Sequence, residues 1–176
     1  MKELYFISLL VPSPETHEIT LIRNELSQKF NCHHALKSPP HITLHMPFRL
    51  DPAKYDLLEK ALRGVEKPAS FHIVTGSIKH FGNRTIYIDV VENSSLSQFR
   101  AMLQDELFSQ IQIPREKRHA FNPHITLANR DINPNSFDDM MTFLQGKTYA
   151  DKFTVHEISL LKHNGEKWEI CLSCRC

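Results

Sequence analysis

The chain has 176 residues, of which 41% are hydrophobic, and a formal net charge of +1. This length suits one substantial core, or one domain made of two small lobes, and the composition is that of a folded chain. The small charge argues against a protein that wraps long duplex nucleic acid, because such binding needs a marked basic surplus. A small phosphate ligand stays compatible with it. The eleven histidines indicate chemistry near neutral pH.

The two ends of the chain read as strands. The N-terminal apolar run is too short to span a membrane and no small-residue cleavage site follows it, so we expect a buried first strand and a cytoplasmic protein. Cys32 stands alone and the other three cysteines crowd the C-terminus, which is not a disulfide framework. Alternating apolar residues from Trp168 to Cys174 predict a final strand there. A zinc site built from these cysteines is the alternative.

Hydrophobic periodicity divides the first half of the chain into alternating strands and helices. The predicted elements are a strand over 3–11, a helix over 14–30, a strand over 40–48, a helix over 51–65 and a strand over 70–81. Asp51 is the expected N-cap of the second helix, with Pro52 at its first position. A tight turn at Gly82-Asn83 should follow the last of these strands.

The second half repeats the same order of elements. The predictions are a strand over 84–91, a helix over 94–108, a strand at 123–127, a helix that carries Phe137 to Leu144, and strands over 152–162 and 166–174 joined by an Asn164-Gly165 turn. We therefore expect one domain over 1–176 that contains two pseudo-repeat halves, about 1–82 and 83–176. Two such halves can pack about an approximate twofold axis.

The five-residue motif PHITL occurs once in each half. Side chains alternate along a strand, so His41 and Thr43 should share one face, as should His124 and Thr126. The twofold axis would bring the two motif strands side by side or face to face, around one cleft. Two histidines with near-neutral pKa values can act as general base and general acid, while the hydroxyls donate hydrogen bonds to an anion. A phosphodiester suits that arrangement, and the sequence leaves open which histidine takes which role.

The segments PPHITLHMPF and NPHITLANR resemble the two H-x-T-x signatures of the 2H phosphoesterase superfamily, in particular its 2′-5′ RNA ligase-like proteins. The resemblance covers essentially the full chain and implies a bilobal α+β fold, with an antiparallel sheet in each lobe and the active cleft between the lobes. It also implies metal-independent chemistry, without a cofactor, on 2′,3′-cyclic phosphates or 2′-5′ phosphodiesters. By position, His41 and His124 would be the acid–base pair, and Thr43 and Thr126 would hold the phosphate oxygens.

Three further residues follow from the same resemblance. Relatives often carry an arginine directly after HITLA, whereas here Asn129 intervenes and the arginine is Arg130. The segment KHFGNRTIYIDV is similar to the family stretch that forms an aromatic pocket wall, which suggests that Phe81 and Tyr87 bind substrate. No phosphate-binding glycine loop of the ATP-dependent type occurs in the sequence, which argues against ATP-dependent ligation. Hydrolysis is the expected net direction in dilute aqueous solution.

Two other functions stay open. His45 lies two residues beyond Thr43, on the face expected for His41, so a zinc hydrolase using His41, His45 and His124 is one alternative. The basic loop 115–119 suggests a non-catalytic RNA-end-binding protein as another. The expected partners are RNA ends or small cyclic nucleotide phosphates, without membrane or long duplex nucleic acid, and a monomer is expected.

Overall fold

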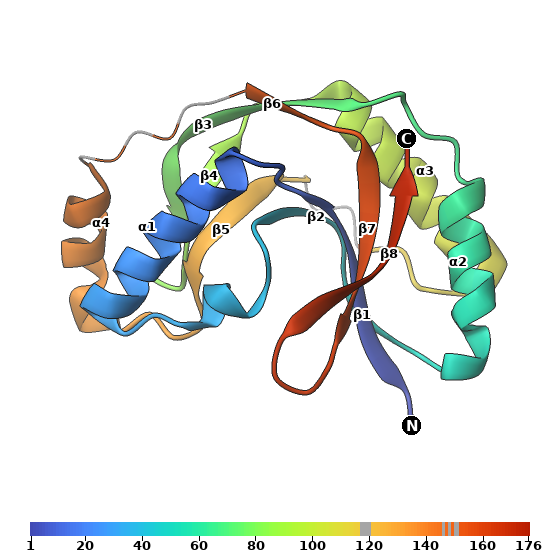
Figure 1. Ribbon diagram of the computed structural model, residues 1–176, viewed down its shortest axis with the longest axis horizontal. Helices are drawn as coiled ribbons and strands as arrows, with labels where there is room; N and C mark the ends of the chain where they lie inside the picture. Colours follow the sequence, from blue (N-terminus) through green and yellow to red (C-terminus); the bar gives the residue numbers. More distant parts are fainter. Residues whose placement is uncertain (117–120, 146, 148, 150–151) are drawn as a thin grey trace.

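The computed structural model describes residues 1–116, 121–145, 147, 149 and 152–176 (Figure 1). The strands in this part of the chain are β1 (Glu3–Leu10), β2 (His41–Leu50), β3 (Phe71–Phe81), β4 (Thr85–Val90), β5 (His124–Asn129), β6 (Lys152–Val155), β7 (Glu157–His163) and β8 (Trp168–Arg175). The helices are α1 (Glu15–Phe30), α2 (Tyr55–Gly64), α3 (Ser94–Ile111) and α4 (Phe137–Gln145), with 3₁₀ turns η1 (His34–Lys37), η2 (Pro52–Lys54) and η3 (Pro134–Ser136).

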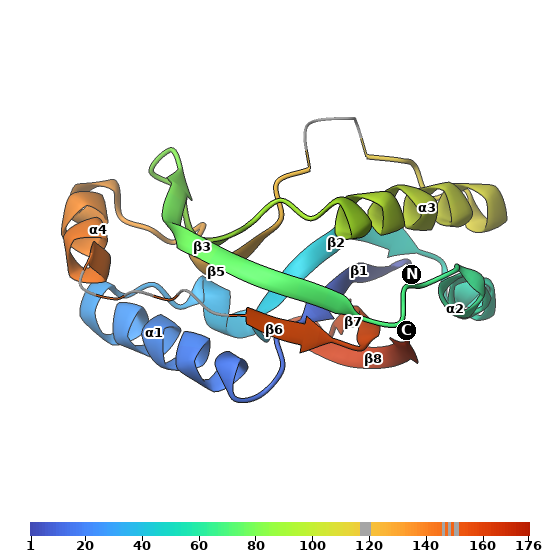
Figure 2. The same ribbon diagram turned by 90° about the horizontal axis from the view of Figure 1, so that it is seen from above.

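The strands form one curled antiparallel sheet in the order β6-β3-β4-β5-β2-β1-β7-β8. Its two four-stranded halves meet where β2 pairs with β5, at Ile42 and Ile125. Figures 1 and 2 place α1 and α4 at the end of the molecule that holds β4 and β5, and α2 and α3 at the other end. The structure is therefore the expected α+β fold of two lobes, with the two antiparallel sheets joined edge to edge at the centre.

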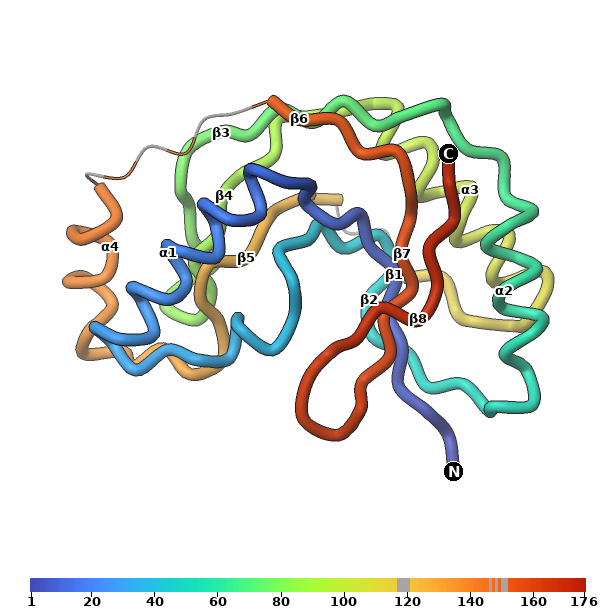
Figure 3. Tube along the Cα trace, in the orientation of Figure 1, coloured from blue at the N-terminus to red at the C-terminus, as the bar shows by residue number. Residues whose placement is uncertain are grey.

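The two lobes share strands from both halves of the sequence. β3, from the first half, pairs with β4, whereas β7, from the second half, pairs with β1. Figure 3 shows the consequence at the ends of the chain, where the first strand and the last two strands run side by side in one lobe. β3 thus lies in the sheet of β4, β5 and β6, and the β7–β8 hairpin extends the sheet of β1 and β2.

The single strand expected over 152–162 is wrong. The chain breaks at His156 into β6, which pairs with β3, and β7, which pairs with β1. A straight strand cannot pair with both neighbours, because β3 and β1 belong to opposite lobes of the curled sheet. The apolar alternation changes phase at this crossing, because the polar pair His156-Glu157 separates Phe153 and Val155 from Ile158 and Leu160. That shift is the local mark of the break.

Most predicted boundaries agree with the structure to within a few residues. Asp51 accepts a hydrogen bond from the backbone N–H of Ala53, as an N-cap does, although a turn of 3₁₀ helix precedes α2. The expected turn between β3 and β4 contains Gly82 at a φ of +50°, a conformation that glycine adopts without strain. The short η1 turn was not predicted. No helix in the described ranges is long and apolar enough to cross a membrane.

The core fixes which way the two motifs face. Ile42 and Ile125, at the centre of the sheet, are fully buried beneath the helices together with the apolar faces of all four helices. Because neighbouring side chains of a strand point to opposite faces, this burial turns the flanking histidines and threonines to the other side of the sheet. These polar side chains are half-buried.

Candidate active site

Each motif strand contains an extra residue at its leucine. Relative to β1, β2 has one unpaired residue at Leu44, and relative to β4, β5 has one at Leu127. Such a β-bulge changes the face to which the following residues point. The residue after each bulge, His45 in β2 and Ala128 in β5, is buried. Both motifs therefore present their histidine and threonine, and not the residue after the bulge, to the side away from the core.

The two His–Thr pairs open into one cavity. His41, Thr43, His124 and Thr126 all line a space of about 1090 Å³. The other walls are the β7–β8 hairpin, the turn between β3 and β4, and the η1 segment. The structure thus brings together all four residues that the two motifs predict.

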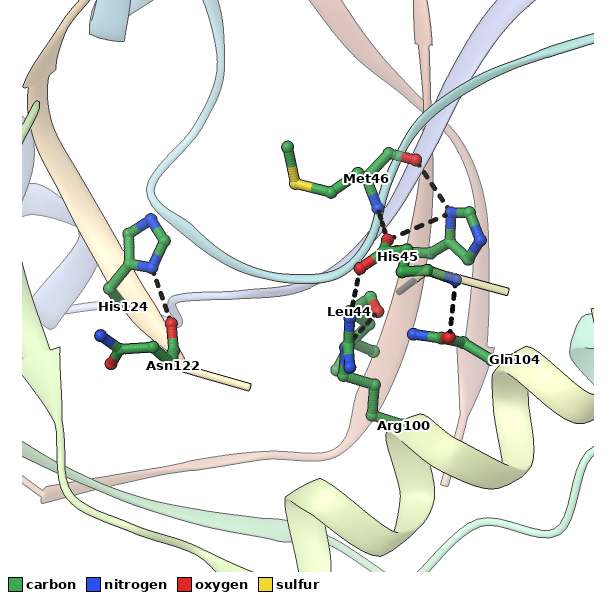
Figure 4. Close-up of polar contacts among 8 residues, drawn as sticks. Leu44, His45, Met46, Arg100, Gln104, Asn122 and His124 are labelled. Atoms are coloured by element: carbon green, nitrogen blue, oxygen red, sulfur yellow. Dashed lines mark hydrogen bonds and ion pairs between the residues drawn. The ribbon is translucent and has the colours of Figure 1, made fainter. Parts of the chain in front are cut away.

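Each imidazole is held by the carbonyl group two residues before it. Nδ1 of His41 lies 2.7 Å from the Pro39 oxygen, and Nδ1 of His124 lies 2.9 Å from the Asn122 oxygen (Figure 4). A carbonyl oxygen can only accept, so Nδ1 carries the proton and donates it in both rings. The neutral form of each ring therefore keeps its lone pair on Nε2, the nitrogen that is free to meet a substrate.

The two histidines differ in their electrostatic surroundings. Burial lowers the pKa of His41 to about 4, and the positive charge of Arg23 acts in the same direction. Burial also lowers the pKa of His124, but the nearby carboxylate of Asp89 opposes that change. Asp89 pairs with His124 across β4 and β5, whereas the residue opposite His41 is the uncharged Leu10. Both rings are therefore neutral at pH 7, and His124 is the one placed beside an anion.

Arg23 is a cavity residue that sequence reasoning missed. It lies in α1 between the buried residues Ile19 and Leu26 and is only 2% exposed. The spacing places Arg23 on the same face of the helix as these two core residues. An arginine is rarely buried on such a face without a function or a partner. That position on the apolar face of a helix was the available signal.

The guanidinium of Arg23 is bound to backbone carbonyls. Nε and Nη2 donate to the Thr126 oxygen at 2.9 and 2.6 Å, and Nη1 donates to the oxygens of Ala35 and Ser38 at 3.1 and 2.9 Å. Among the described residues, no carboxylate forms an ion pair with it. Burial lowers its pKa to about 10, so it remains charged at neutral pH. Arg23 lines the cavity and supplies it with a buried, uncompensated positive charge.

Aromatic rings support His124 on one side of the cavity. Phe81 stacks on Tyr87 with ring centroids 4.2 Å apart, and the two centroids lie 5.3 and 5.0 Å from that of His124. Phe81 is 42% exposed and lines the cavity, whereas Tyr87 is buried. Of the two predicted aromatic residues, Phe81 is therefore available to a ligand and Tyr87 lies behind it.

A second aromatic group lies beside His41. The ring centroid of Phe6 is 4.8 Å from that of His41 and 4.6 Å from that of Trp168, which in turn is 5.0 Å from that of His163. Phe6, His163 and Trp168 all line the cavity. These residues come from β1 and from the β7–β8 hairpin, far from either motif in the sequence, so no local pattern pointed to them.

Arg130 reaches the cavity in spite of the intervening Asn129. Its φ is +65°, a left-handed conformation that is uncommon outside glycine, and its backbone N–H donates to the Arg84 oxygen at 3.3 Å. This turn at the end of β5 leaves both arginines among the residues that line the cavity, together with Lys37 of η1. The cavity is thus cationic although the chain as a whole is close to neutral.

His45 does not face the cavity, so the alternative of a zinc site formed by His41, His45 and His124 is wrong. The bulge at Leu44 turns this side chain into the protein, where it is 4% exposed and packs against Phe48 with centroids 5.2 Å apart. Its Nδ1 lies 2.9 Å from the Met46 oxygen, and Figure 4 shows its ring well apart from that of His124. In the described part of the chain, no group of three or more potential metal ligands is found, at the C-terminal cysteines or elsewhere.

The segment after α3 is fastened to the end of the first motif. Arg100 donates to the Leu44 oxygen at 3.1 Å and forms an ion pair with Glu116, whose carboxylate also accepts the N–H of Met46 (Figure 4). The backbone N–H of Glu116 donates to the Gln104 side chain at 3.0 Å. These contacts fix the end of α3 and Glu116, which precede the second motif in the sequence, against the bulge in the first motif.

The basic loop before the second motif is only partly described. Arg115 forms an ion pair with Asp105 and lies over the Phe108 ring, 4.3 Å from its centroid, so it is held against α3. Lys117, Arg118 and His119 lie outside the described residues.

Known proteins share both the sequence pattern and the fold. Curated relatives from Bacillus cytotoxicus and Staphylococcus epidermidis, which bear the name "Putative phosphoesterase", are 28% and 26% identical over 84% and 92% of both chains. Escherichia coli LigT, in a structure complexed with 3′-AMP, superposes with a TM-score of 0.70 at 14% identity, over 99% of this chain and 98% of that one. TT0787 of Thermus thermophilus gives a TM-score of 0.68 at 14% identity, over 99% and 97%.

The sequence profile of the 2′-5′ RNA ligase superfamily matches residues 11–167, which include both motifs and all the described strands except β1 and β8. A match over so much of the sequence decides membership, and the shared fold agrees with it. The chain therefore belongs to the 2′-5′ RNA ligase superfamily and is a phosphoesterase of the 2H type.

Proposed function

We propose that the protein hydrolyses 2′,3′-cyclic phosphates or 2′-5′ phosphodiesters of RNA or nucleotides, without a metal ion, by two-histidine acid–base catalysis. One observation carries this proposal: two imidazoles, each fixed with Nε2 free, line the same cationic cavity. An acid and a base placed on either side of a phosphate are sufficient for this chemistry.

The phosphate would lie between the two motifs. The hydroxyls of Thr43 and Thr126 can donate to its nonbridging oxygens, and the buried charge of Arg23 favours an anion at this point. Fixed donors and charges in a site of low dielectric stabilise the additional negative charge of the transition state. Binding an anion also raises the pKa of both histidines toward neutrality, because opposite charge favours the protonated ring.

We assign the roles of the two rings from their surroundings. His41, near Arg23, is neutral and accepts a proton from the attacking water on Nε2. His124, beside Asp89, holds a proton more readily and gives it to the departing ribose oxygen. The new P–O bond comes from water and the broken bond is the one to the ribose oxygen. One proton enters His41 and one leaves His124, so the pair is reset by exchange with solvent.

The relatives support a nucleotide-sized substrate. LigT has been solved with 3′-AMP and with ATP, which shows that its fold can hold a nucleotide. A cavity of about 1090 Å³ in the present chain exceeds what inorganic phosphate needs. We therefore extend nucleotide binding to this protein as part of the proposal.

The test is turnover in excess chelator with 2′,3′-cyclic nucleotides, RNA that ends in a cyclic phosphate, and 2′-5′ dinucleotides. His41→Ala and His124→Ala should each lower kcat by about 10²-fold or more. His72→Ala, an exposed histidine of β3 outside the cavity, is the matched control and should stay within about twofold of wild type. Either motif variant retaining wild-type turnover would refute the two-histidine mechanism, and identifying the product as a 2′- or 3′-phosphate would establish which bond breaks.

A further inference from the structure

We propose that Trp168, supported by Phe6 and His163, forms a second nucleobase subsite, so that the preferred substrate carries a nucleoside on each side of the scissile phosphodiester. This inference rests on the proposed function and narrows it: a dinucleotide linkage should be a better substrate than a cyclic mononucleotide or a simple alkyl ester.

The two aromatic groups lie on opposite sides of the proposed phosphate position. Phe81 adjoins His124, whereas Phe6 adjoins His41 and leads to Trp168. An in-line displacement places the attacking and leaving oxygens on opposite sides of phosphorus, each near one of the two histidines. The leaving oxygen lies near His124, so its nucleoside would lie on the side of Phe81. The other nucleoside stays bonded to phosphorus through an oxygen that neither attacks nor leaves, and the aromatic surface left for it in the cavity is that of Phe6 and Trp168.

The arrangement around Trp168 suits a stacked base. Phe6 and His163 meet the indole at 88° and 76°, so neither ring occupies it in the parallel geometry that a nucleobase would take. Trp168 is half-buried and lines the cavity. Base–aromatic stacking of this kind tolerates any sequence, because every base has a π-face.

Charge and volume favour the same occupant. Arg84 and Arg130 lie near Phe81, where they can meet the phosphates of a chain that extends from the first nucleoside. The hairpin that carries Trp168 places Glu166 at the cavity, the one carboxylate among its described lining residues. A carboxylate disfavours a further phosphate there and accepts an uncharged nucleoside. The volume of about 1090 Å³ is at the upper end for single small ligands, which leaves room for two nucleosides.

The first experiment compares kcat/KM for three substrates in the wild type and in Trp168→Ala. They are adenylyl-(2′-5′)-adenosine, the methyl diester of adenosine 5′-phosphate, which keeps the leaving 5′-oxygen with its nucleoside but lacks the nucleoside that stays on phosphorus, and 2′,3′-cyclic AMP. The wild type should prefer the dinucleotide over the methyl diester by about 5- to 100-fold, and Trp168→Ala should lose that preference. Trp168→Phe should retain most of it. Ile170→Ala, on the exposed part of the same strand, is the matched control.

The second experiment needs no variant. Trp168 is the single tryptophan of the chain, so intrinsic indole fluorescence reports on this position alone. Adenosine should quench that fluorescence saturably, inorganic phosphate should not, and Phe81→Ala should leave the adenosine effect unchanged. This readout also covers the case in which Trp168→Ala does not fold.

The outcomes separate the two levels of the proposal. Equal activity of the wild type toward the dinucleotide and the methyl diester, a uniform loss on all three substrates in Trp168→Ala, or no saturable quenching would each overturn the second subsite. Hydrolysis of 2′,3′-cyclic AMP by the same preparation would then leave the proposed function standing. Absence of turnover on all three substrates would count against the proposed function itself.

Discussion

The two motif strands have the same local geometry and different charges around it. In both strands, Nδ1–H of the histidine donates a hydrogen bond to the carbonyl oxygen two residues before it, and a bulge at the leucine buries the side chain that follows. Yet Leu10 is opposite His41, whereas Asp89 is opposite His124. The comparison teaches that a symmetric scaffold can position two identical rings while their neighbours keep one ring unprotonated, as a general base must be, and make the other easier to protonate, as a general acid must be.

Removing the buried cation should have the largest effect among the residues outside the motifs. In Arg23→Met, kcat/KM is expected to fall by about 10²- to 10³-fold, because a preorganised charge at the phosphate position is lost. The pKa of His41 should rise, since the positive charge that lowers it is gone. The acidic limb of the pH–kcat/KM profile should therefore move to higher pH.

The control for Arg23→Met is Arg23→Lys, which keeps the charge but not the paired hydrogen bonds. Circular dichroism and thermal melting establish that each variant is folded. A folded Arg23→Met protein with an unchanged rate and pH profile would contradict a role for this charge.

The pH dependence of the wild type tests the division of roles. If His124 is the acid, kcat/KM falls as pH rises through its pKa, which lies below the ordinary value for histidine. The optimum of kcat/KM should therefore lie on the acid side of about 6.5, the reference value for a histidine. A profile that rises continuously up to pH 8 would contradict this assignment.

Asp89→Asn should make the electrostatic surroundings of His124 more like those of His41. Loss of the carboxylate lowers the pKa of His124 further, so the alkaline limb of the profile should move to lower pH, with about a 10-fold loss of kcat/KM at pH 7. Lys79, which lies 2.6 Å from the same carboxylate, provides a control of opposite sign. In Lys79→Met the limb should stay in place or move to higher pH. A shift of the alkaline limb in the same direction in both variants would contradict this explanation.

Breaking the contact between the first motif and the segment after α3 should have a moderate effect on stability. Glu116→Gln weakens the ion pair to Arg100 and the bond from the Met46 N–H, so we expect the free energy of unfolding to fall by about 1–3 kcal/mol. Urea denaturation measures it, with the exposed Glu66→Gln as the matched control. Equal free energies of unfolding for the two variants would show that these contacts do not stabilise the fold.

The smallest effect is expected at Ser8. It pairs with Thr43 as Tyr87 pairs with Thr126, but its hydroxyl is buried without a hydrogen-bond partner among the described residues. Ser8→Ala removes an unsatisfied polar group, so stability should be unchanged or rise by up to about 1 kcal/mol. A clear loss of stability in the same urea assay would show that the hydroxyl has a role that its contacts do not reveal.

Sequence periodicity predicted the fold well because its helices and strands are local and amphipathic. The doubled motif likewise predicted which four side chains meet. The bulge at Leu44 could not be foreseen, because one unpaired residue inside a strand leaves no mark on apolar alternation, and this placed His45 on the wrong face. Arg23 and Trp168 reach the cavity only through long-range packing, which no motif spacing encodes.

The crossing of β3 and of the β7–β8 hairpin between the two lobes has a consequence for the rigidity of the molecule. A polypeptide that ended after β3 would leave β3 without β4, and one that began at β4 would leave β7 without β1. Either one could complete its sheet only by exchanging strands with a second copy. Pulling the lobes apart would require breaking backbone ladders, so the spacing between the paired imidazoles is set when the protein folds.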